Sequence, residues 1–360
     1  MINLYYTPFF YQAILLIIVI TWIHTFRHTG FTTITFSFNK KSTLFLFIFS
    51  ILYMGLRPIN GHFGDMKVYR NIFNIYANGG SPPITNDIGF YSMMKLVSYF
   101  QSSLLFFFIV DLLYIVPLYI AVKRWFPKYY FFAFLILVAS FSFWTYGTNG
   151  LRNGMATSFM LLAFSFKNNK MYKYVLFLLA FSFHSSMLVV IIAYFLSVIL
   201  KNSKIYFSGW LLSIILSISM GTFWETIFMN LGFGQEDKLQ AYFGKKEEFA
   251  DQFASTGFRW DFLIYSSTAV IIAYYFIMIK KFKDPHYKQL VNIYLLVNSF
   301  WILVIRASFS NRFAYLSWFM MGIIIIYPFL KKVYWKNQFS IIGYVILLYF
   351  SFTYFMNVII

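Results

Sequence analysis

Cysteine is absent from the 360-residue chain, and charged residues make up only 11% of it. The first absence excludes a disulfide framework, a thiolate nucleophile and a cysteine metal site. Soluble-enzyme motifs are missing as well, since the sequence has no Gly-rich phosphate loop, no HExxH and no GxSxG. With so few carboxylates close together, we expect neither a metal nor another cofactor.

Apolar residues dominate what is present, at 60% of the chain. This proportion is far above that of an average soluble domain and indicates an integral membrane protein. The N-terminus, MINLYYTPFF, lacks a basic segment and a small-residue cleavage site, so we expect its apolar run to be a retained helix. We predict one transmembrane domain over residues 1–360.

A helix needs about 20 apolar residues to cross a bilayer, or somewhat fewer when lysines flank it. On this basis we predict an all-α polytopic fold with about 10 full spans and a short helical hairpin, about 12 helices in total. The predicted spans are residues 9–26, 42–57, 103–121, 129–147, 153–167, 206–229, 261–279, 289–305, 313–330 and 338–357.

The formal net charge of +18 comes from lysines and arginines clustered between the apolar runs. Such clusters are typical of cytoplasmic loops beside anionic lipid headgroups, so we expect membrane lipids and no nucleic acid as partners. The clusters are Arg27/Lys40/Lys41, Lys123/Arg124/Lys128, Lys167/Lys170/Lys173, Lys201/Lys204, Lys280/Lys281/Lys283/Lys288 and Lys331/Lys332/Lys336. Placing all of them in the cytoplasm predicts that both termini are extracytoplasmic.

The run 174–200 has lysines on both flanks, so a single crossing would place one cluster outside. We therefore predict a hairpin of two short helices, about 172–183 and 186–200, with a bend at the FHSS sequence near the outer side. This topology makes 57–102 and 230–260 outer loops that form part of a substrate site. Seven of the eleven acidic residues lie in them: Asp65, Asp87, Glu236, Asp237, Glu247, Glu248 and Asp251.

His184 is the candidate catalytic residue of the bend. A titratable group at membrane depth is costly and is a functional candidate by default, and a histidine near neutral pKa suits general acid–base chemistry. The alternative is a ring that only satisfies a backbone group at a helix end.

Arginines form the second group of candidates. Arg152, in GLRNG, stands at the outer start of a helix, where a guanidinium beside a helix N-terminus suits a phosphate group. An interfacial snorkelling arginine is the alternative. Arg306 and Arg312 bracket a short outer segment, and Arg259 and Asp261 stand where the long outer loop enters a helix, either in the site or as a simple capping pair.

Arg57, Asp65 and Tyr69 complete the candidate residues, in LRPINGHFGDMKVY. Asp65 and Tyr69 are four residues apart and share a face if this segment is a short helix. Arginines gathered on the outer face, in a chain whose other basic residues are cytoplasmic, predict an electropositive pocket for an anionic, lipid-attached substrate such as a polyprenyl diphosphate.

Several short motifs, in order from about residue 54 to 320, resemble those of the EpsG family of bacterial membrane proteins, which are Wzy-like polysaccharide polymerases. The motifs are MGLRPINGHFGDMKVYRNIF, DIGFYSMMKLV, GLRNGMATSFMLLAFSF, LLAFSFHSSMLVV, GFRWDFLIYS and SNRFAYLSWF. Two departures occur, because Phe63-Gly64-Asp65 replaces the usual Gly-Thr-Asp and Asn153 stands where glutamine is commoner.

The resemblance implies an extracytoplasmic glycosyltransferase in the bacterial plasma membrane. It would polymerise undecaprenyl-diphosphate-linked oligosaccharide repeat units into a surface polysaccharide, with a flippase and a chain-length regulator as pathway partners. We expect His184 to be the general base, with Asp65 as the competing choice, and Arg152, Arg259 and Arg312 to hold the diphosphate. Asp261 would orient Arg259.

Three other functions stay open at this point. A flippase or transporter of lipid-linked oligosaccharide would need the same electropositive outer pocket, although no internal repeat of the kind common in transporters is found. A membrane O-acyltransferase would also use a membrane histidine, but would need an acyl-donor site near it on the cytoplasmic side. A structural subunit of an export complex would use the arginines only to bind lipid.

Overall fold

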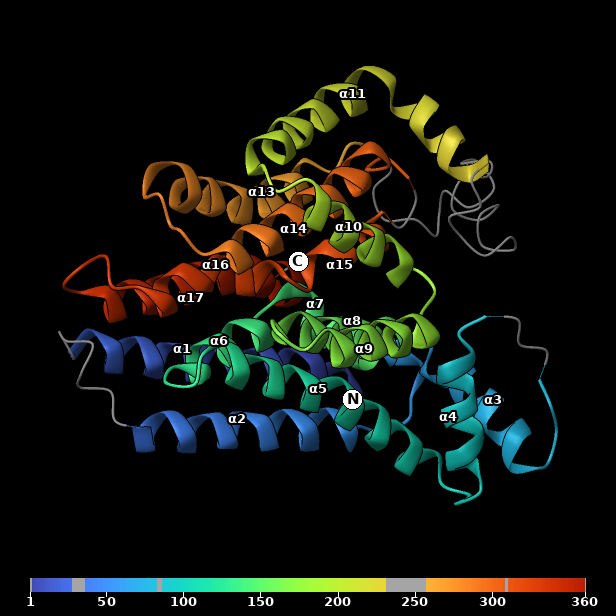
Figure 1. Cartoon of the computed structure of the whole chain (residues 1–360). Coiled ribbons are helices and arrows are strands. Elements are labelled where there is room, and N and C mark those ends of the chain that lie inside the picture. Colours follow the sequence, from blue (N-terminus) through green and yellow to red (C-terminus); the bar gives the residue numbers. More distant parts are fainter. Residues whose placement is uncertain (1, 28–35, 83–85, 231–256, 308–309, 360) are drawn as a thin grey trace. The chain divides into compact units, whose positions relative to one another are not determined.

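The computed structural model describes residues 2–27, 36–82, 86–230, 257–307 and 310–359. These residues form helices joined by short turns, so the predicted all-α class is confirmed for them (Figure 1). They divide into two compact units, which are described separately. Unit 1 contains residues 1–187 and 326–360, and unit 2 contains residues 188–325.

Unit 1 carries the N-terminal half of the chain and its last helices. Its elements are α1 (Ile2–Arg27), α2 (Phe36–Gly55), the 3₁₀ turn η1 (Gly61–Phe63), α3 (Met66–Ala77), α4 (Ile88–Ser98), α5 (Ser103–Trp125), α6 (Tyr130–Val138), α7 (Phe141–Thr148), α8 (Leu151–Ser165), α9 (Lys170–Phe183), α17 (Gln338–Tyr354) and the π-helical turn η4 (Phe355–Ile359). Helices α3 and α4 lie at one end of this unit (Figure 1).

Unit 2 is built around α14 (Pro285–Leu303), which packs on α11 (Ser203–Asn230), α13 (Trp260–Tyr274) and α15 (Asn311–Trp318). It also contains most of α10 (Met187–Ile199), the π-helical turn η3 (Tyr275–Ile279) and the first half of α16 (Met321–Lys331), whose second half belongs to unit 1.

Buried polar side chains join the helices of unit 2. Asn298 of α14 accepts a hydrogen bond from the Trp210 indole (2.8 Å) and donates to the hydroxyls of Ser266 (3.2 Å) and Ser317 (3.0 Å). Trp318 donates its indole N–H to Ser266 as well. Because an unpaired polar group is costly inside a membrane domain, this network sets how α11, α13, α14 and α15 pack.

The prediction of about 10 full spans is wrong. Among the described residues, six segments are long and apolar enough to cross a membrane, or up to seven if one bent pair counts as a span. They are Tyr5–Phe26, Ser103–Trp125, Ser203–Gly221, Trp260–Ile279, Asn311–Lys331 and Gln338–Ile359, with Tyr130–Val138 and Phe141–Thr148 as the bent pair. The structure therefore supports a multi-pass membrane protein with fewer spans.

Each discrepancy has a local cause. The run predicted at 129–147 bends by 68° between α6 and α7. The spans predicted at 153–167, 42–57 and 289–305 correspond to α8, α2 and α14. Helix α8 has only 15 residues, α2 contains the polar sequence Asn39-Lys40-Lys41 near its start, and α14 carries polar residues along its length.

The break predicted within 174–200 is confirmed. Helix α9 ends at Phe183 and α10 begins at Met187, so His184 lies between two short helices. The backbone of His184 is extended (φ −154°, ψ 120°), which ends the helical hydrogen-bond pattern there.

A cluster of basic side chains lies at one end of unit 1. Helices α5 and α8 are in contact at their middles, where Ser158 donates to the carbonyl of Leu113 (3.3 Å). They are also in contact at their C-terminal ends, where the Arg124 guanidinium lies 3.7 Å from the centre of the Phe166 ring. The two helices therefore run in the same direction. Their C-terminal ends meet that of α16, where Lys331 donates to the Trp125 carbonyl. Basic side chains therefore gather at the end of the unit where α5, α8 and α16 finish.

A buried ion pair lies inside unit 1. Arg57 follows α2 and pairs with Asp111 in the middle of α5, and both side chains are fully buried. The Nε and Nη2 atoms of Arg57 and one carboxylate oxygen of Asp111 have no hydrogen-bond partner. The predicted role of Arg57 in holding a substrate is not supported by this position, since its guanidinium faces the interior.

Replacing Asp111 with Asn leaves the Arg57 charge buried without its counter-ion, which costs about 3–5 kcal/mol in buried pairs. We expect Asp111→Asn to lower the unfolding midpoint clearly in detergent micelles. The double variant Arg57→Met/Asp111→Leu removes both charges and is expected to recover most of the loss. A wild-type midpoint for Asp111→Asn would show that the pair does not stabilise the unit.

Candidate functional site

Asp65 stands immediately before α3, at the end of unit 1 opposite to the one where α5, α8 and α16 finish. Its backbone N–H donates to the side-chain oxygen of Asn149 (3.0 Å), which follows α7. Gly64 adopts φ +62°, and a Cβ there would come within 2.2 Å of the Asn149 oxygen. Only glycine therefore allows this close approach, which holds the Asp65 backbone against the start of α8.

The carboxylate of Asp65 is half-buried. Among the described residues, no hydrogen bond or ion pair involves it. A carboxylate that is positioned by its backbone and unpaired at its oxygens can accept a proton or a hydrogen bond from a ligand.

Asp87 is the residue that joins three elements of the site. It lies just before α4 in the left-handed conformation (φ 56°, ψ 45°) and is 5% exposed. One carboxylate oxygen binds Nη1 of Arg152 at 2.6 Å, and the other accepts the backbone N–H of Ser185 at 2.9 Å. A single side chain thus ties α4 to the start of α8 and to the break after α9.

Arg152 lies in the first turn of α8 with 13% of its side chain exposed. Besides the bond to Asp87, its Nε donates to the hydroxyl of Tyr69 (3.1 Å). The rings of Tyr69 and Tyr91 lie 5.9 and 5.8 Å from the guanidinium carbon. Within the described part of the chain its Nη2 has no partner, so this nitrogen can bind an anion while the other contacts stay in place.

Tyr69 is buried on α3 and remains a neutral phenol. Burial raises the pKa of Tyr69 to about 12, against the opposing effect of the Arg152 guanidinium. Burial also raises the pKa of Tyr91, with Arg152 opposing and the carboxylates of Asp87 and Asp65 adding to the rise. Both hydroxyls therefore keep their protons at neutral pH.

His184 is half-buried at the break, and its Nδ1 accepts the backbone N–H of Ser186 (3.2 Å). An Nδ1 that accepts a hydrogen bond leaves the proton of the neutral ring on Nε2. The Ser186 hydroxyl donates to the side-chain oxygen of Asn153 on α8 (3.3 Å). Ser186 thus links His184 to Asn153, the residue after Arg152. The basic lone pair of His184 Nδ1 already accepts the Ser186 N–H.

The structure brings together four of the residues predicted from the sequence: Asp65, Tyr69, Arg152 and His184 all belong to this end of unit 1. Arg57 belongs to the same unit but is buried against Asp111. The remaining predicted residues lie in unit 2.

In unit 2, Arg259 and Asp261 form a two-pronged ion pair at the start of α13, with distances of 2.9 and 2.6 Å. The sequence left a simple Arg259–Asp261 pair as an alternative. The pair is observed, although the side chain of Arg259 makes no capping hydrogen bond to α13. Arg306 is half-buried and contacts the Ile218 carbonyl (3.5 Å), and Arg312 is exposed on α15. The acidic residues predicted between positions 236 and 251 lie outside the described residues.

Sequence reasoning missed three residues of the site: Asp87, Tyr91 and Asn149. Asp87 was noted only as one of several outer carboxylates. Its place before the helix-like run IGFYSMMKLV was the available signal, since Asp is favoured before a helix. Asn149, in TNGLRNG, carried no signal for its contact with a segment 84 residues away.

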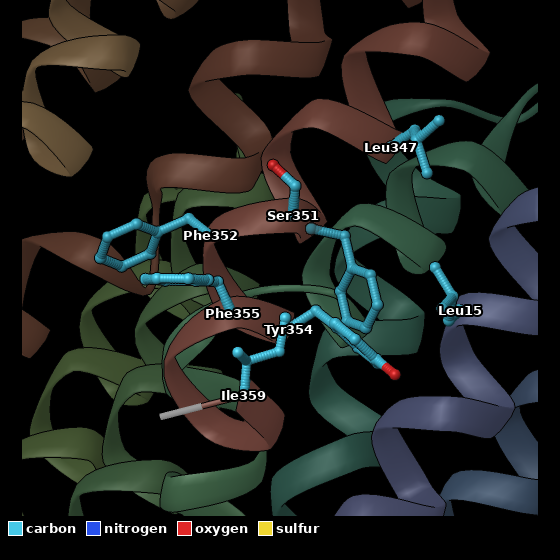
Figure 2. A pocket seen from close by; sticks show the side chains of 8 residues that line it. Leu15, Leu347, Ser351, Phe352, Tyr354, Phe355 and Ile359 are labelled. Carbon is cyan, nitrogen blue, oxygen red and sulfur yellow. The ribbon is translucent and has the colours of Figure 1, made fainter.

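A second surface feature of unit 1 is an apolar groove of about 550 Å³ along α1, α17 and η4 (Figure 2). Its lining is Leu15, Leu347, Phe350, Ser351, Phe352, Tyr354, Phe355 and Ile359. It contains none of the predicted site residues. Within the described ranges there is also no group of three or more His, Cys, Asp or Glu residues that could hold a metal ion.

Comparison with known proteins shows the family of the chain. The model of the EpsG family matches residues 40–360. No curated protein and no solved structure matches the sequence. Because the family match covers most of the 360 residues, including every residue of the site in unit 1, this chain belongs to the EpsG family.

Proposed function

We propose that the chain is a glycosyltransferase of exopolysaccharide biosynthesis that joins undecaprenyl-diphosphate-linked oligosaccharide repeat units. Its substrate would be an oligosaccharide on a polyprenyl diphosphate, and its acceptor the terminal sugar of a second lipid-linked unit. The observation that carries this proposal is that Arg152, which has a spare Nη2, and Asp65, whose carboxylate is unpaired, lie at the same end of unit 1, on either side of Tyr69.

The reaction needs two functions that this cluster can supply. The bond between the anomeric carbon and the diphosphate oxygen breaks, and the diphosphate leaves with the electron pair. Arg152 would stabilise the charge that develops on it. A new bond forms between the anomeric carbon and the acceptor oxygen, and the hydroxyl proton passes to a base.

The geometry favours Asp65 over His184 as that base. The Asp65 oxygens are unpaired and half-buried, whereas the lone pair of His184 Nδ1 already accepts the Ser186 N–H. We therefore assign the proton transfer to Asp65, which reverses the preference drawn from the sequence. His184 holds the break in a shape that presents the Ser185 N–H to Asp87.

The basic cluster where α5, α8 and α16 finish supports an extracytoplasmic site at the opposite end of unit 1. Arg152 and Phe166 stand at opposite ends of α8, about 21 Å apart along the helix axis. Phe166 packs on Arg124 at the basic end, which the positive-inside rule assigns to the cytoplasm. Arg152 and its partners then lie at the outer side of the plasma membrane.

This orientation can be tested with cysteines, because the natural chain has none. Ser185 and Lys128 are both exposed and lie near the two ends of unit 1. We expect Ser185→Cys to react with an impermeant thiol reagent added to intact cells, and the matched variant Lys128→Cys to react only after the membrane is opened. The reverse pattern would overturn the orientation.

The activity itself is tested by incubating the purified protein with its lipid-diphosphate-linked repeat unit and measuring the length of lipid-linked glycans. Longer glycans are expected from the wild type without any other pathway protein. Transport of the lipid-linked unit across a vesicle membrane without elongation would replace the polymerase by a flippase. Acyl transfer to the glycan without elongation would replace it by an O-acyltransferase.

A further inference from the structure

A row of tyrosines leads away from Arg152 along the α3–α4 hairpin. Asp65, Tyr69 and Tyr76 are separated by four and seven residues, which places them within about 40° of one another around α3. Tyr91 of α4 lies beside this row, because its ring is 5.8 Å from the guanidinium carbon of Arg152, which also donates to Tyr69. Burial raises the pKa of Tyr76, and Tyr91 adds to the rise. Tyr69 and Tyr76 are about 10 Å apart along the helix axis.

Burial decreases along the row. Tyr69, next to the guanidinium, is 4% exposed, whereas Tyr91 and Tyr76 are half-buried. Across the described residues, no hydrogen bond involves the hydroxyl of Tyr91 or of Tyr76. Both side chains therefore offer part of a ring face and a free hydroxyl to a ligand. Asp65 offers an unpaired carboxylate at the N-terminal end of α3.

The chemistry of the row selects a class of ligand. Ring faces contact the C–H groups of a sugar, and neutral hydroxyls and a carboxylate bond its hydroxyl groups. The basic residues of α3, Lys67 and Arg70, lie on the opposite side of the helix and are exposed. The cation that contacts the row is Arg152, through the hydroxyl of Tyr69 and the ring of Tyr91. Lys95, four residues after Tyr91 on α4, is exposed to solvent. One partly buried guanidinium suits the diphosphate end of a ligand rather than a polyanion along the whole row.

We propose that Tyr91 and Tyr76 form a saccharide-binding subsite, which takes the glycan of the lipid-linked substrate where it extends from the diphosphate at Arg152. This inference rests on the proposed function, because it needs a substrate that joins a glycan to a diphosphate. The inference assigns two binding functions within the site. Arg152 binds the diphosphate, which all such carriers share, and the tyrosine row binds the sugars.

Two probes separate these contributions in the full-length protein reconstituted in nanodiscs. One is undecaprenyl diphosphate without sugar, and the other is the repeat-unit-bearing carrier extracted from polysaccharide-producing cells. We expect Tyr91→Ala to weaken binding of the glycan-bearing carrier about fivefold to tenfold, the worth of one good aromatic contact, and to weaken binding of the sugar-free carrier clearly less. Tyr91→Phe keeps the ring and is expected to lose less.

Tyr99 supplies the matched control, because it is 74% exposed at the end of α4 and lies outside the row. We expect Tyr99→Ala to bind both probes as the wild type does. Equal affinity of wild type and Tyr91→Ala for the glycan-bearing carrier, or equal weakening of both probes by Tyr91→Ala and Tyr91→Phe, would overturn the subsite.

Arg152→Gln distinguishes failure of the subsite from failure of the proposed function. It should weaken binding of both probes, since both contain the diphosphate. If Arg152→Gln binds sugar-free undecaprenyl diphosphate as well as the wild type, the proposed function loses its main support. If only the tyrosine variants behave unexpectedly, the subsite is wrong and the diphosphate assignment stands.

Discussion

Replacing Asp65 with Asn is expected to lower kcat for glycan elongation by about 100-fold to 10,000-fold, with little change in KM. Asn is nearly the same size, is equally favoured before a helix, and leaves the backbone hydrogen bond to Asn149 in place. The loss would therefore report the missing proton acceptor. It is measured with the purified protein, from initial rates of elongation of the lipid-linked repeat unit.

His184→Asn is the matched comparison. The side-chain oxygen of Asn can accept the Ser186 N–H from about the position of Nδ1, but Asn cannot take up a proton at neutral pH. If His184 only holds the break, this variant keeps activity within about tenfold of the wild type, the scale of a lost positioning contact rather than of a lost base. A large loss in His184→Asn combined with an active Asp65→Asn would return the base to His184.

The second large effect is expected for Arg152→Gln. Removing one group that stabilises the developing charge of a leaving group typically costs about 100-fold to 1,000-fold in kcat. Gln is polar but shorter, and its amide nitrogen lies at about the position of Nε, so it can still contact Tyr69 while the positive charge and the Nη1 contact with Asp87 are lost. Arg152→Lys restores the charge without the forked geometry and should recover only part of the rate.

Asp87→Asn serves as the control for orientation in this experiment. Asn accepts the left-handed conformation of position 87 and can still bind the Ser185 N–H, but it no longer carries the charge that pairs with Arg152. We expect a smaller loss than in Arg152→Gln. Wild-type activity in Arg152→Gln, measured as glycan length against time, would remove Arg152 from the mechanism.

Some features of the site followed from the residue pattern alone. The lysines on both sides of 174–200 predicted a break at His184, and α9 ends one residue before it. Asp65 and Tyr69 were predicted to share a helix face, and Tyr69 lies on α3, which begins one residue after Asp65. Both predictions concern neighbours in the chain, where helix periodicity and charge are sufficient evidence.

The number of membrane spans could not be predicted from helix periodicity, charge and hydropathy. Hydropathy measures the transfer of residues into hydrocarbon, and it does not report where a helix bends or stops. The apolar run at 129–147 looks continuous in the sequence, yet α6 and α7 meet at 68°. Conversely, α2 and α14 are long helices whose polar residues set them apart from the six apolar segments.

The sequence by itself determined the membrane class, the family motifs and the position of the break, because composition and short patterns encode them. Only the tertiary structure decided which candidates act together. Asp87 contacts Arg152 and Ser185, which are 65 and 98 residues away, and Arg57 instead pairs with Asp111 inside the helices. Partners so distant in the chain are chosen by helix packing, which brings the start of α8 against α3 and α4 and leaves Arg57 enclosed.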